Sequence, residues 1–113
     1  NVKSNHPEKT AHPAQFPVEL VERCVLALTN KDSWVLDPFA GVGSTAIASL
    51  KNYRNSIGIE KEKEYVNLAI ERIENLKEGK LKLRPINKPI HKPRENDKIA
   101  KVPQEWAKKY KEA

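Results

Sequence analysis

Cysteine is scarce in this sequence, methionine is absent, and no apolar run is long enough to span a membrane. The single cysteine, Cys24, excludes a disulfide framework, and its place among apolar residues at helical spacing predicts a buried thiol in a reducing compartment. Without a signal peptide or a membrane-spanning segment, the sequence favours a cytoplasmic protein with no membrane partner. The chain also starts at Asn1 and not at methionine, so we expect it to be a piece of a longer product.

Acidic residues are scarce in only one part of the chain. Residues 80–113 contain eleven Lys or Arg but four Asp or Glu, a net charge of +7, whereas residues 1–79 carry a net charge of −1. Such asymmetry is typical of proteins that contact nucleic acid, although a tail that only improves solubility gives the same pattern. At 113 residues, the chain is long enough for one small domain.

Regular periodicity is confined to the middle of the chain. Residues 1–16 contain two His-Pro pairs and predict a loop, because a residue before proline avoids the helical region. Residues 17–84 show helix and strand patterns, and the basic residues 85–113 are broken by prolines and predict an extended tail. The predicted elements are a helix over 17–29, a buried strand over 33–37, a helix over 44–51, a strand over 53–60, a helix over 63–77 that stops before Gly79, a short edge strand over 81–83 and a short helix over 104–112.

This alternation of short strands and helices predicts an α/β fold with a parallel sheet and right-handed crossovers. One apolar face is expected on the first helix, where the apolar residues recur at helical spacing. Its members are Val18, Val21, Val25 and Leu28, with Leu20 and Cys24 beside them.

The most informative stretch is the glycine turn, which we define as residues 37–45, Asp-Pro-Phe-Ala-Gly-Val-Gly-Ser-Thr. A strand ends at Asp37, and the chain passes Gly41 and Gly43 before it enters a helix, an arrangement that suits a nucleotide-like ligand. The two glycines, with Glu60 further on, also fit the fingerprint of NAD-binding proteins. Asp37 favours S-adenosylmethionine (AdoMet) over NAD, because its carboxylate would repel a pyrophosphate but attract an ammonium group.

Glu60 follows the second predicted strand, where a carboxylate is placed to accept hydrogen bonds from both hydroxyls of a ribose. The run of alternating charges over 60–64 would by itself indicate a solvated surface, so the preceding strand decides in favour of a ligand contact. Phe39 has two open interpretations, as a core residue or as a ring that stacks on a cationic part of the ligand.

Three blocks of the sequence together resemble the DNA amino-methyltransferases, which methylate adenine N6 or cytosine N4. The blocks are residues 9–17 (Lys-Thr-Ala-His-Pro-Ala-Gln-Phe-Pro), similar to the family's tenth motif, residues 37–45, similar to its first, and residues 57–60 with Tyr65, Ala69 and Arg72, similar to its second. Their order resembles the permuted beta group, in which the catalytic region precedes the cofactor region. The resemblance covers residues 9–76 and implies a Rossmann-like AdoMet-binding half-domain.

The resemblance also implies a role for each matching residue. Asp37 would reach the ammonium group of AdoMet, Glu60 the ribose hydroxyls and Lys61 the adenine edge. Ser44 and Thr45 would offer hydroxyl and N–H groups to the carboxylate of the ligand. The cofactor-binding residues implied are Thr10, His12, Ala14, Asp37, Pro38, Phe39, Gly41, Gly43, Ser44, Thr45, Glu60 and Lys61, and no metal ligand is expected.

The chain departs from the family in one respect, because it contains no Pro-Pro pair. The family's catalytic motif is Asp, Ser or Asn followed by Pro-Pro and an aromatic residue, and it holds the amino group of an extruded base. In the permuted order this motif lies upstream. We therefore expect a catalytic segment before Asn1 or on another chain, and we expect this chain alone to be inactive.

The expected function is the AdoMet-binding portion of a site-specific DNA methyltransferase in a restriction-modification system. Double-stranded DNA would be held in part by the basic tail. Three alternatives stay open: a fragment of an RNA or small-molecule methyltransferase, a NAD-dependent fragment, and a non-catalytic subunit that senses the cofactor or binds DNA. The sequence leaves the target base, adenine or cytosine, undecided.

Overall fold

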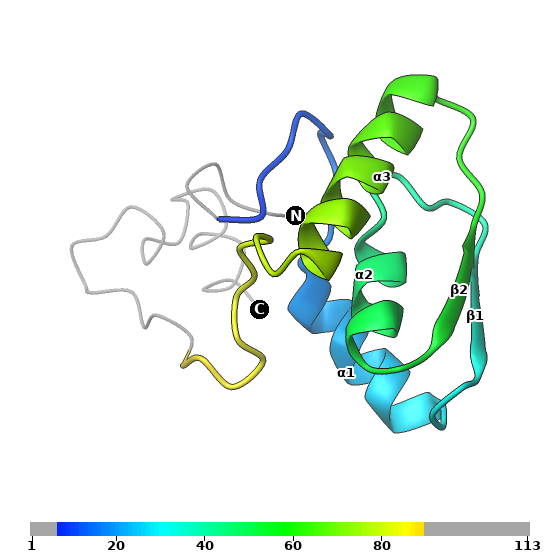
Figure 1. Cartoon of the computed structure of the whole chain (residues 1–113), viewed down its shortest axis with the longest axis vertical. Coiled ribbons are helices and arrows are strands. Elements are labelled where there is room, and N and C mark those ends of the chain that lie inside the picture. The colour runs from blue at the N-terminus through cyan, green and yellow to red at the C-terminus, as the bar shows by residue number, and fades with distance from the viewer. Residues whose placement is uncertain (1–6, 90–113) are drawn as a thin grey trace, which may run out of the picture.

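Three helices lie on one side of a two-stranded parallel sheet in the computed structural model, which describes residues 7–89 (Figure 1). The elements are α1 (Val18–Leu28), β1 (Trp34–Asp37), α2 (Ser44–Lys51), β2 (Asn55–Gly58) and α3 (Lys63–Lys77). These are the five central elements that the sequence predicts, each ending within two residues of its predicted bounds. Within the described residues, no helix has the length and apolar character needed to cross a membrane.

The parallel pairing of β1 with β2 brings the carboxyl ends of both strands to one edge of the sheet. Trp34 pairs with Asn55 at one end of the ladder, and Asp37 pairs with Gly58 at the other. The crossover between the strands is made by α2, which contacts both of them and α1. Asp37 and Glu60, which follow from the two strands, therefore lie at the same edge, which is the edge that binds ligands in open α/β sheets.

The hydrophobic core lies between the helices and one face of the sheet. Val18 and Val25 of α1 and Ile47 and Ala48 of α2 are buried at its centre. Leu81 and Leu83, which follow α3, pack against this cluster without forming a strand. The predicted edge strand over 81–83 is therefore wrong. Its two leucines pack against the hydrophobic core, and this packing does not require the backbone to pair with another strand.

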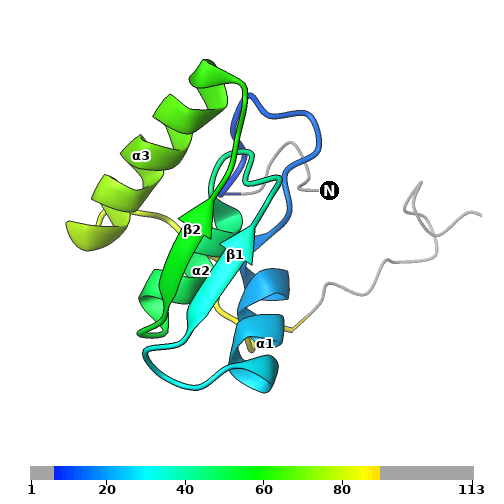
Figure 2. The same cartoon turned by 90° about the vertical axis from the view of Figure 1, so that its right-hand side faces the viewer.

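The opposite face of the sheet is exposed, as Figure 2 shows with both strands in front of the helices. Trp34 is 68% exposed and Leu36 is 63% exposed, and Ile57 and Ile59 are more than half exposed. The prediction of a buried first strand is therefore wrong for β1, because Val35 is its one apolar residue that packs against the core. We define Trp34, Leu36, Ile57 and Ile59 as the open face.

Three residues predicted to lie on or beside the apolar face of α1 are exposed. Cys24 is an exposed free thiol, Leu20 is 51% exposed, and Leu28 is 81% exposed at the end of the helix. The buried side of α1 instead includes Glu22, whose carboxylate accepts hydrogen bonds from Lys51 (2.8 Å) and Asn52 (2.9 Å). Helical spacing predicts an apolar face, but the contacts of the helix decide how wide that face is.

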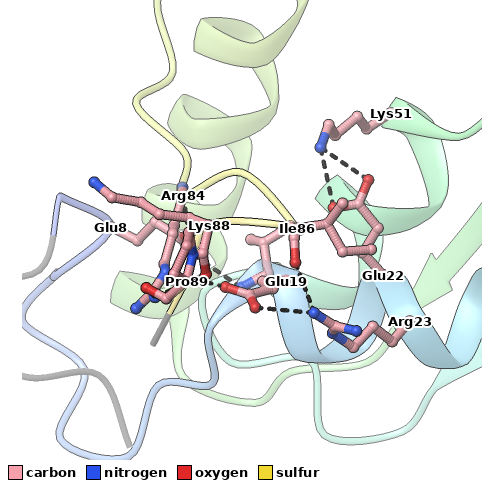
Figure 3. A network of polar contacts seen from close by, with 10 residues as sticks. Glu8, Glu19, Glu22, Arg23, Lys51, Arg84, Ile86, Lys88 and Pro89 are labelled. Atoms are coloured by element: carbon pink, nitrogen blue, oxygen red, sulfur yellow. Dashed lines mark hydrogen bonds and ion pairs between the residues drawn. The ribbon is translucent and has the colours of Figure 1, made fainter. Parts of the chain in front are cut away.

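The segment after α3 returns to the start of α1, where it is held by polar contacts (Figure 3). Glu19 forms an ion pair with Arg84 (3.3 Å), and Arg23 donates a hydrogen bond to the carbonyl oxygen of Ile86 (2.6 Å). The buried carboxylate of Glu8 accepts hydrogen bonds from the backbone N–H groups of Val18 and Arg84. The tail predicted from residue 85 is thus bonded to α1 at Ile86, and Arg84 donates hydrogen bonds to the carbonyl oxygens of Lys88 (3.3 Å) and Pro89 (3.1 Å). The predicted helix over 104–112 lies outside the described residues.

Candidate cofactor site

The glycine turn is held in a conformation that only glycine adopts without strain at two positions. Gly41 has a φ of +52° and Gly43 a φ of +78°. A Cβ atom on Gly41 would lie 3.2 Å from Nε2 of His12, and one on Gly43 would lie 3.0 Å from Cβ of Ala69. Both glycines therefore combine a left-handed backbone with close packing, against the loop before α1 on one side and α3 on the other.

Asp37 fixes the entry of the turn through both carboxylate oxygens. Oδ1 accepts a hydrogen bond from the N–H of Phe39 (3.0 Å), and Oδ2 accepts one from the hydroxyl of Thr45 (2.5 Å). A carboxylate has about four acceptor positions, so these two bonds leave acceptor capacity on each oxygen. The charge at the strand tip is thus held in place while it can still accept from a cationic ligand.

Glu60 connects the turn to the end of β2. Its Oε1 accepts a hydrogen bond from the N–H of Glu62, and its Oε2 accepts one from the N–H of Gly41, each at 2.9 Å. The hydrogen bond from the N–H of Glu62 is the largest cause that lowers the pKa of the Glu60 carboxyl below 4.5; desolvation opposes it, and the hydrogen bond from the N–H of Gly41 lowers the pKa further. The carboxylate is therefore ionised at neutral pH and fixed in orientation.

The loop before α1, residues 7–16, covers the glycine turn on the side opposite to α3. Gln15 is 2% exposed, and its Oε1 accepts hydrogen bonds from the N–H (3.0 Å) and hydroxyl (2.8 Å) of Thr10. Nδ1 of His12 accepts a hydrogen bond from the N–H of Ala14 (3.1 Å), and the imidazole ring packs on Tyr65 of α3 at 4.4 Å between centroids. These contacts place the His12 ring directly over Gly41.

A cavity of about 220 Å³ lies between the 7–16 loop and the glycine turn. It is lined by His12, Ala14, Gln15, Phe16, Phe39, Ala40, Gly41, Val42, Ser44 and Glu60. A second cavity of about 320 Å³ adjoins it and is lined by Pro38, Phe39, Ile59, Glu60 and Lys61. Phe39 and Glu60 border both cavities. Phe39 is 89% exposed, which excludes its interpretation as a core residue of this chain.

Most of the residues predicted to contact a cofactor line these two cavities. Gly43 instead lines a third cavity, of about 480 Å³, between α2, β2 and α3; its lining is largely apolar and contains no cationic side chain. Thr10, Asp37 and Thr45 line none of the three. Thr10 stabilises Gln15, which does line the first cavity, through a hydrogen bond from its hydroxyl, and Thr45 donates its hydroxyl proton to Asp37 next to that cavity.

The hydroxyl groups at the start of α2 differ from expectation. Ser44 donates its hydroxyl proton to the carbonyl oxygen of Phe16 (2.9 Å), and Thr45 donates its own to Asp37. Neither proton is thus directed to a ligand. The groups of this helix end that can still bind an anion are the backbone N–H groups of its first turn, which have no intrahelical acceptor.

Sequence reasoning missed several lining residues and the support behind them. Ala40 and Val42 belong to the glycine turn, so the motif itself could have indicated them. Gln15 and Phe16 lie in the matching block of residues 9–17, which could have indicated them in the same way. Arg72 carried a different signal, as part of the second matching block, but its contact with Val42 joins positions 30 residues apart. Within residues 7–89, no group of three or more His, Cys, Asp or Glu side chains is placed to hold a metal ion.

Comparison with known proteins gives consistent matches to DNA-modifying enzymes. A family model described as DNA methylase matches residues 1–71. The chain is 48% identical over 69 residues to the type II methyltransferase M.BglII of Bacillus subtilis, and 43% identical over 72 residues to M.ScaI of Streptomyces caespitosus. These matches cover 61% and 64% of this chain but 19% and 24% of the relatives. The chain thus spans about a fifth to a quarter of the curated relatives it matches.

Two solved structures show the same arrangement. The M1.HpyAVI–SAM complex is 41% identical with a TM-score of 0.57, and the match covers 65% of this chain and 40% of that one. A putative DNA modification methylase of Thermus thermophilus, complexed with S-adenosyl-L-methionine, is 43% identical with a TM-score of 0.52; the match covers 53% of this chain and 25% of that one. The α/β fold predicted from the sequence is therefore confirmed.

Proposed function

This chain belongs to the N6/N4 DNA methylase family, and we propose that it forms the AdoMet-binding part of a methyltransferase that modifies an exocyclic amino group of adenine or cytosine in DNA. The names of its relatives support this proposal, because M.BglII and M.ScaI are type II methyltransferases. The two solved structures support the choice of cofactor, because both are complexes with AdoMet. A role in a restriction-modification system follows from the same relatives.

The observation that carries the proposal is the pair of adjoining cavities with Glu60 between them. The cavity between the 7–16 loop and the glycine turn suits the methionine part of AdoMet, since helix N–H groups and the nearby Asp37 carboxylate match its carboxylate and ammonium groups. The second cavity, with Pro38, Phe39 and Lys61, suits the adenine. Glu60 is then placed to accept hydrogen bonds from the ribose hydroxyls with the acceptor capacity that its backbone contacts leave.

When bound, AdoMet supplies an activated methyl group, and the work of this chain is to hold and orient that group. His12 and Ala14 close the methionine cavity from one side, and Phe39 separates it from the adenine cavity. Fixed carboxylates at Asp37 and Glu60 select the orientation of the ligand before any reaction.

The catalytic motif is expected on a segment outside this chain, because the 113 residues contain no Pro-Pro pair. The open face supports this part of the proposal. A parallel sheet is normally covered on both sides, and here Trp34, Leu36, Ile57 and Ile59 leave one side exposed. We assign this face to the catalytic segment, from the same polypeptide or from another chain. Double-stranded DNA would contact that segment and the basic residues 85–113, of which 90–113 lie outside the described residues.

Titration calorimetry of the full 113-residue chain with AdoMet and with NAD tests the cofactor. We expect saturable binding of AdoMet at one site and no heat of binding with NAD. The variant E60Q should weaken AdoMet binding about tenfold, because it removes the charge from hydrogen bonds to the ribose. Binding of NAD without AdoMet would contradict the proposal.

Methyl transfer to DNA tests the division of labour. The chain alone should transfer no methyl group from AdoMet to double-stranded DNA, whereas addition of a segment with the missing motif should restore transfer. In that mixture the variant L36K should reduce activity, while its effect on the stability of the chain alone stays within about 0.5 kcal/mol because Leu36 is exposed. Activity of the chain by itself would show that the catalytic residues lie within it.

A further inference from the structure

Arg72 of α3 is buried behind the glycine turn, with 5% of its surface exposed. Its Nη1 donates a hydrogen bond to the carbonyl oxygen of Val42 (2.6 Å) and lies 3.5 Å from the hydroxyl oxygen of Ser44. That hydroxyl in turn donates to the carbonyl oxygen of Phe16 (2.9 Å). One guanidinium therefore contacts the turn directly and reaches the 7–16 loop through a single side chain, so it connects both walls of the methionine cavity.

Burying the Arg72 guanidinium costs desolvation free energy, which a purely space-filling side chain would not incur. Burial lowers the pKa of Arg72, and the charge of Glu8 opposes that shift only in part. Nη2 of Arg72 is also buried without a hydrogen-bond partner among residues 7–89. Its neighbours on the same helix, such as Ala69 and Ile73, show that apolar side chains are accommodated nearby. A buried charge with incomplete hydrogen bonding is weak support for a role in stability alone.

Arg54, at the other end of the sheet, shows how a buried arginine is arranged when its role is structural. Its Nε, Nη1 and Nη2 donate to the hydroxyl of Thr29, the carbonyl of Asn52 and the carbonyl of Thr29, at 3.0, 2.6 and 2.7 Å. All three nitrogens are thus paired, and none of the residues it contacts lines a cavity described above. The two arginines are similarly buried but differ in what they hold.

We propose that Arg72 is a positioning residue for the cofactor: by holding the Val42 carbonyl and the Ser44 hydroxyl, it fixes the glycine turn in the form that receives the methionine part of AdoMet. The proposal rests on the proposed function, because it assumes that AdoMet occupies this cavity. Without the bond from Nη1, the peptide between Val42 and Gly43 is held only by the hydrogen bond from the Gly43 N–H to the carbonyl oxygen of Ala40 (2.9 Å), so the wall of the methionine cavity is less firmly fixed. Gly41 and Gly43 on either side of Val42 have a wide range of allowed backbone conformations, so they do not by themselves fix this peptide.

The effect should be confined to one part of the ligand. Val42, Ser44 and Phe16 line the methionine cavity but not the adenine cavity, which is formed by Pro38, Phe39, Ile59, Glu60 and Lys61. Loss of the Arg72 contact should therefore weaken ligands that carry the amino-acid group. Ligands with the adenosine part alone should bind as before.

The test measures the dissociation constants of S-adenosylhomocysteine and of methylthioadenosine, which lacks the amino and carboxylate groups, for the full chain and its variants. R72M should weaken S-adenosylhomocysteine about tenfold and methylthioadenosine less than about threefold. R72K, which keeps a charged donor, should recover part of the difference. R54M is the matched control, and its ratio of the two affinities should equal that of the wild type. If R72M does not fold, R72Q, which keeps a donor and removes the charge, replaces it.

The outcomes separate this proposal from the proposed function. Equal weakening of both ligands in R72M, or no weakening of either, would overturn the positioning role and leave AdoMet binding by the wild type intact. A wild-type chain that binds neither ligand would overturn the proposed function, and the role of Arg72 with it. A selective loss in R54M equal to that in R72M would show that any destabilisation produces the effect, which also overturns the proposal.

Discussion

The two ends of the sheet are built from different kinds of contact. At the amino end, polar groups are satisfied by neighbours in the connecting loops: Arg54 bonds Thr29 and Asn52, and the side chain of Asn55 donates to the carbonyl of Asp32. At the carboxyl end, the glycine turn, Glu60 and the 7–16 loop meet from separate parts of the chain and enclose cavities. The polar groups of one end are paired among its own loops, whereas the other end encloses the cavities that we propose hold AdoMet.

Buried polar groups thus have two uses in this small fold. At the amino end it closes the loops, so a substitution there should change stability alone. At the carboxyl end the same kind of bond sets the shape of a cavity, so a substitution there should change affinity as well.

The largest effect is expected from G43A. Its alanine would take a φ of +78° and place Cβ 3.0 Å from Cβ of Ala69, so strain and overpacking combine. We expect a loss of about 2–4 kcal/mol in the free energy of unfolding and loss of measurable AdoMet binding. Urea unfolding followed by circular dichroism and calorimetry with AdoMet measure the two effects.

Gly79 provides the control for backbone strain without crowding. Its φ is +70°, but a Cβ atom there would meet nothing within 4 Å. G79A should therefore cost about 1 kcal/mol and leave AdoMet affinity unchanged. If G79A and G43A behaved alike, packing of the turn against α3 would have no special role.

The second effect is expected from D37N, which removes the charge but keeps the shape of the side chain. Loss of a charged partner for the ammonium group should weaken AdoMet about 10- to 100-fold, with a small change in stability. D32N is the matched control at the amino end, where Asp32 has a φ of 66° that asparagine also adopts readily. Calorimetry should show that D32N binds AdoMet with the affinity of the wild type. If D37N also bound AdoMet as tightly as the wild type, the proposed role of Asp37 would be excluded.

The smallest effect concerns pH. The folded-state pKa of Glu60 lies below its ordinary value of 4.5, chiefly because the N–H of Glu62 donates to the carboxylate. A carboxyl group with a depressed pKa stabilises the fold above about pH 4.5, and this contribution is lost as the pH falls through the lower folded value. The difference in urea midpoint between wild type and E60Q should be constant from about pH 7 to 5 and shrink below about pH 4.5. A difference that grew on acidification would contradict the assignment.

The elements of the fold were predictable because their signals are local. Apolar spacing and the stop at Gly79 place α3 within the bounds observed, and short alternation predicts parallel pairing of β1 with β2. The wrong predictions concern which faces of the elements are buried, and not which residues form helices or strands. The pattern of β1 is the same whether its second face is covered or open, and nothing around Cys24 or Leu28 indicates where the contact of α1 ends.

The candidate site was predictable in part for the same reason. The glycine turn and Glu60 are recognisable by residue type after a strand, whereas the support behind them is formed by pairs distant in sequence. The carboxylate of Glu8 accepts from Arg84, 76 positions away, and Arg72 reaches Val42 across 30. No local pattern encodes such pairs. Polar residues such as Gln15 are ordinarily exposed, so its burial was not expected either.

The most direct test of the account is the map of backbone amide chemical shifts of the 113-residue chain during titration with AdoMet. The account predicts that shifts concentrate in residues 12–16, 39–45 and 60–62, at the carboxyl end of the sheet. Thr29, Asn52 and Arg54 at the amino end should stay unchanged. Shifts confined to the amino end or to Trp34, Leu36 and Ile57 of the open face, or no shifts at saturating AdoMet, would contradict the assignment of the cavity to the methyl donor.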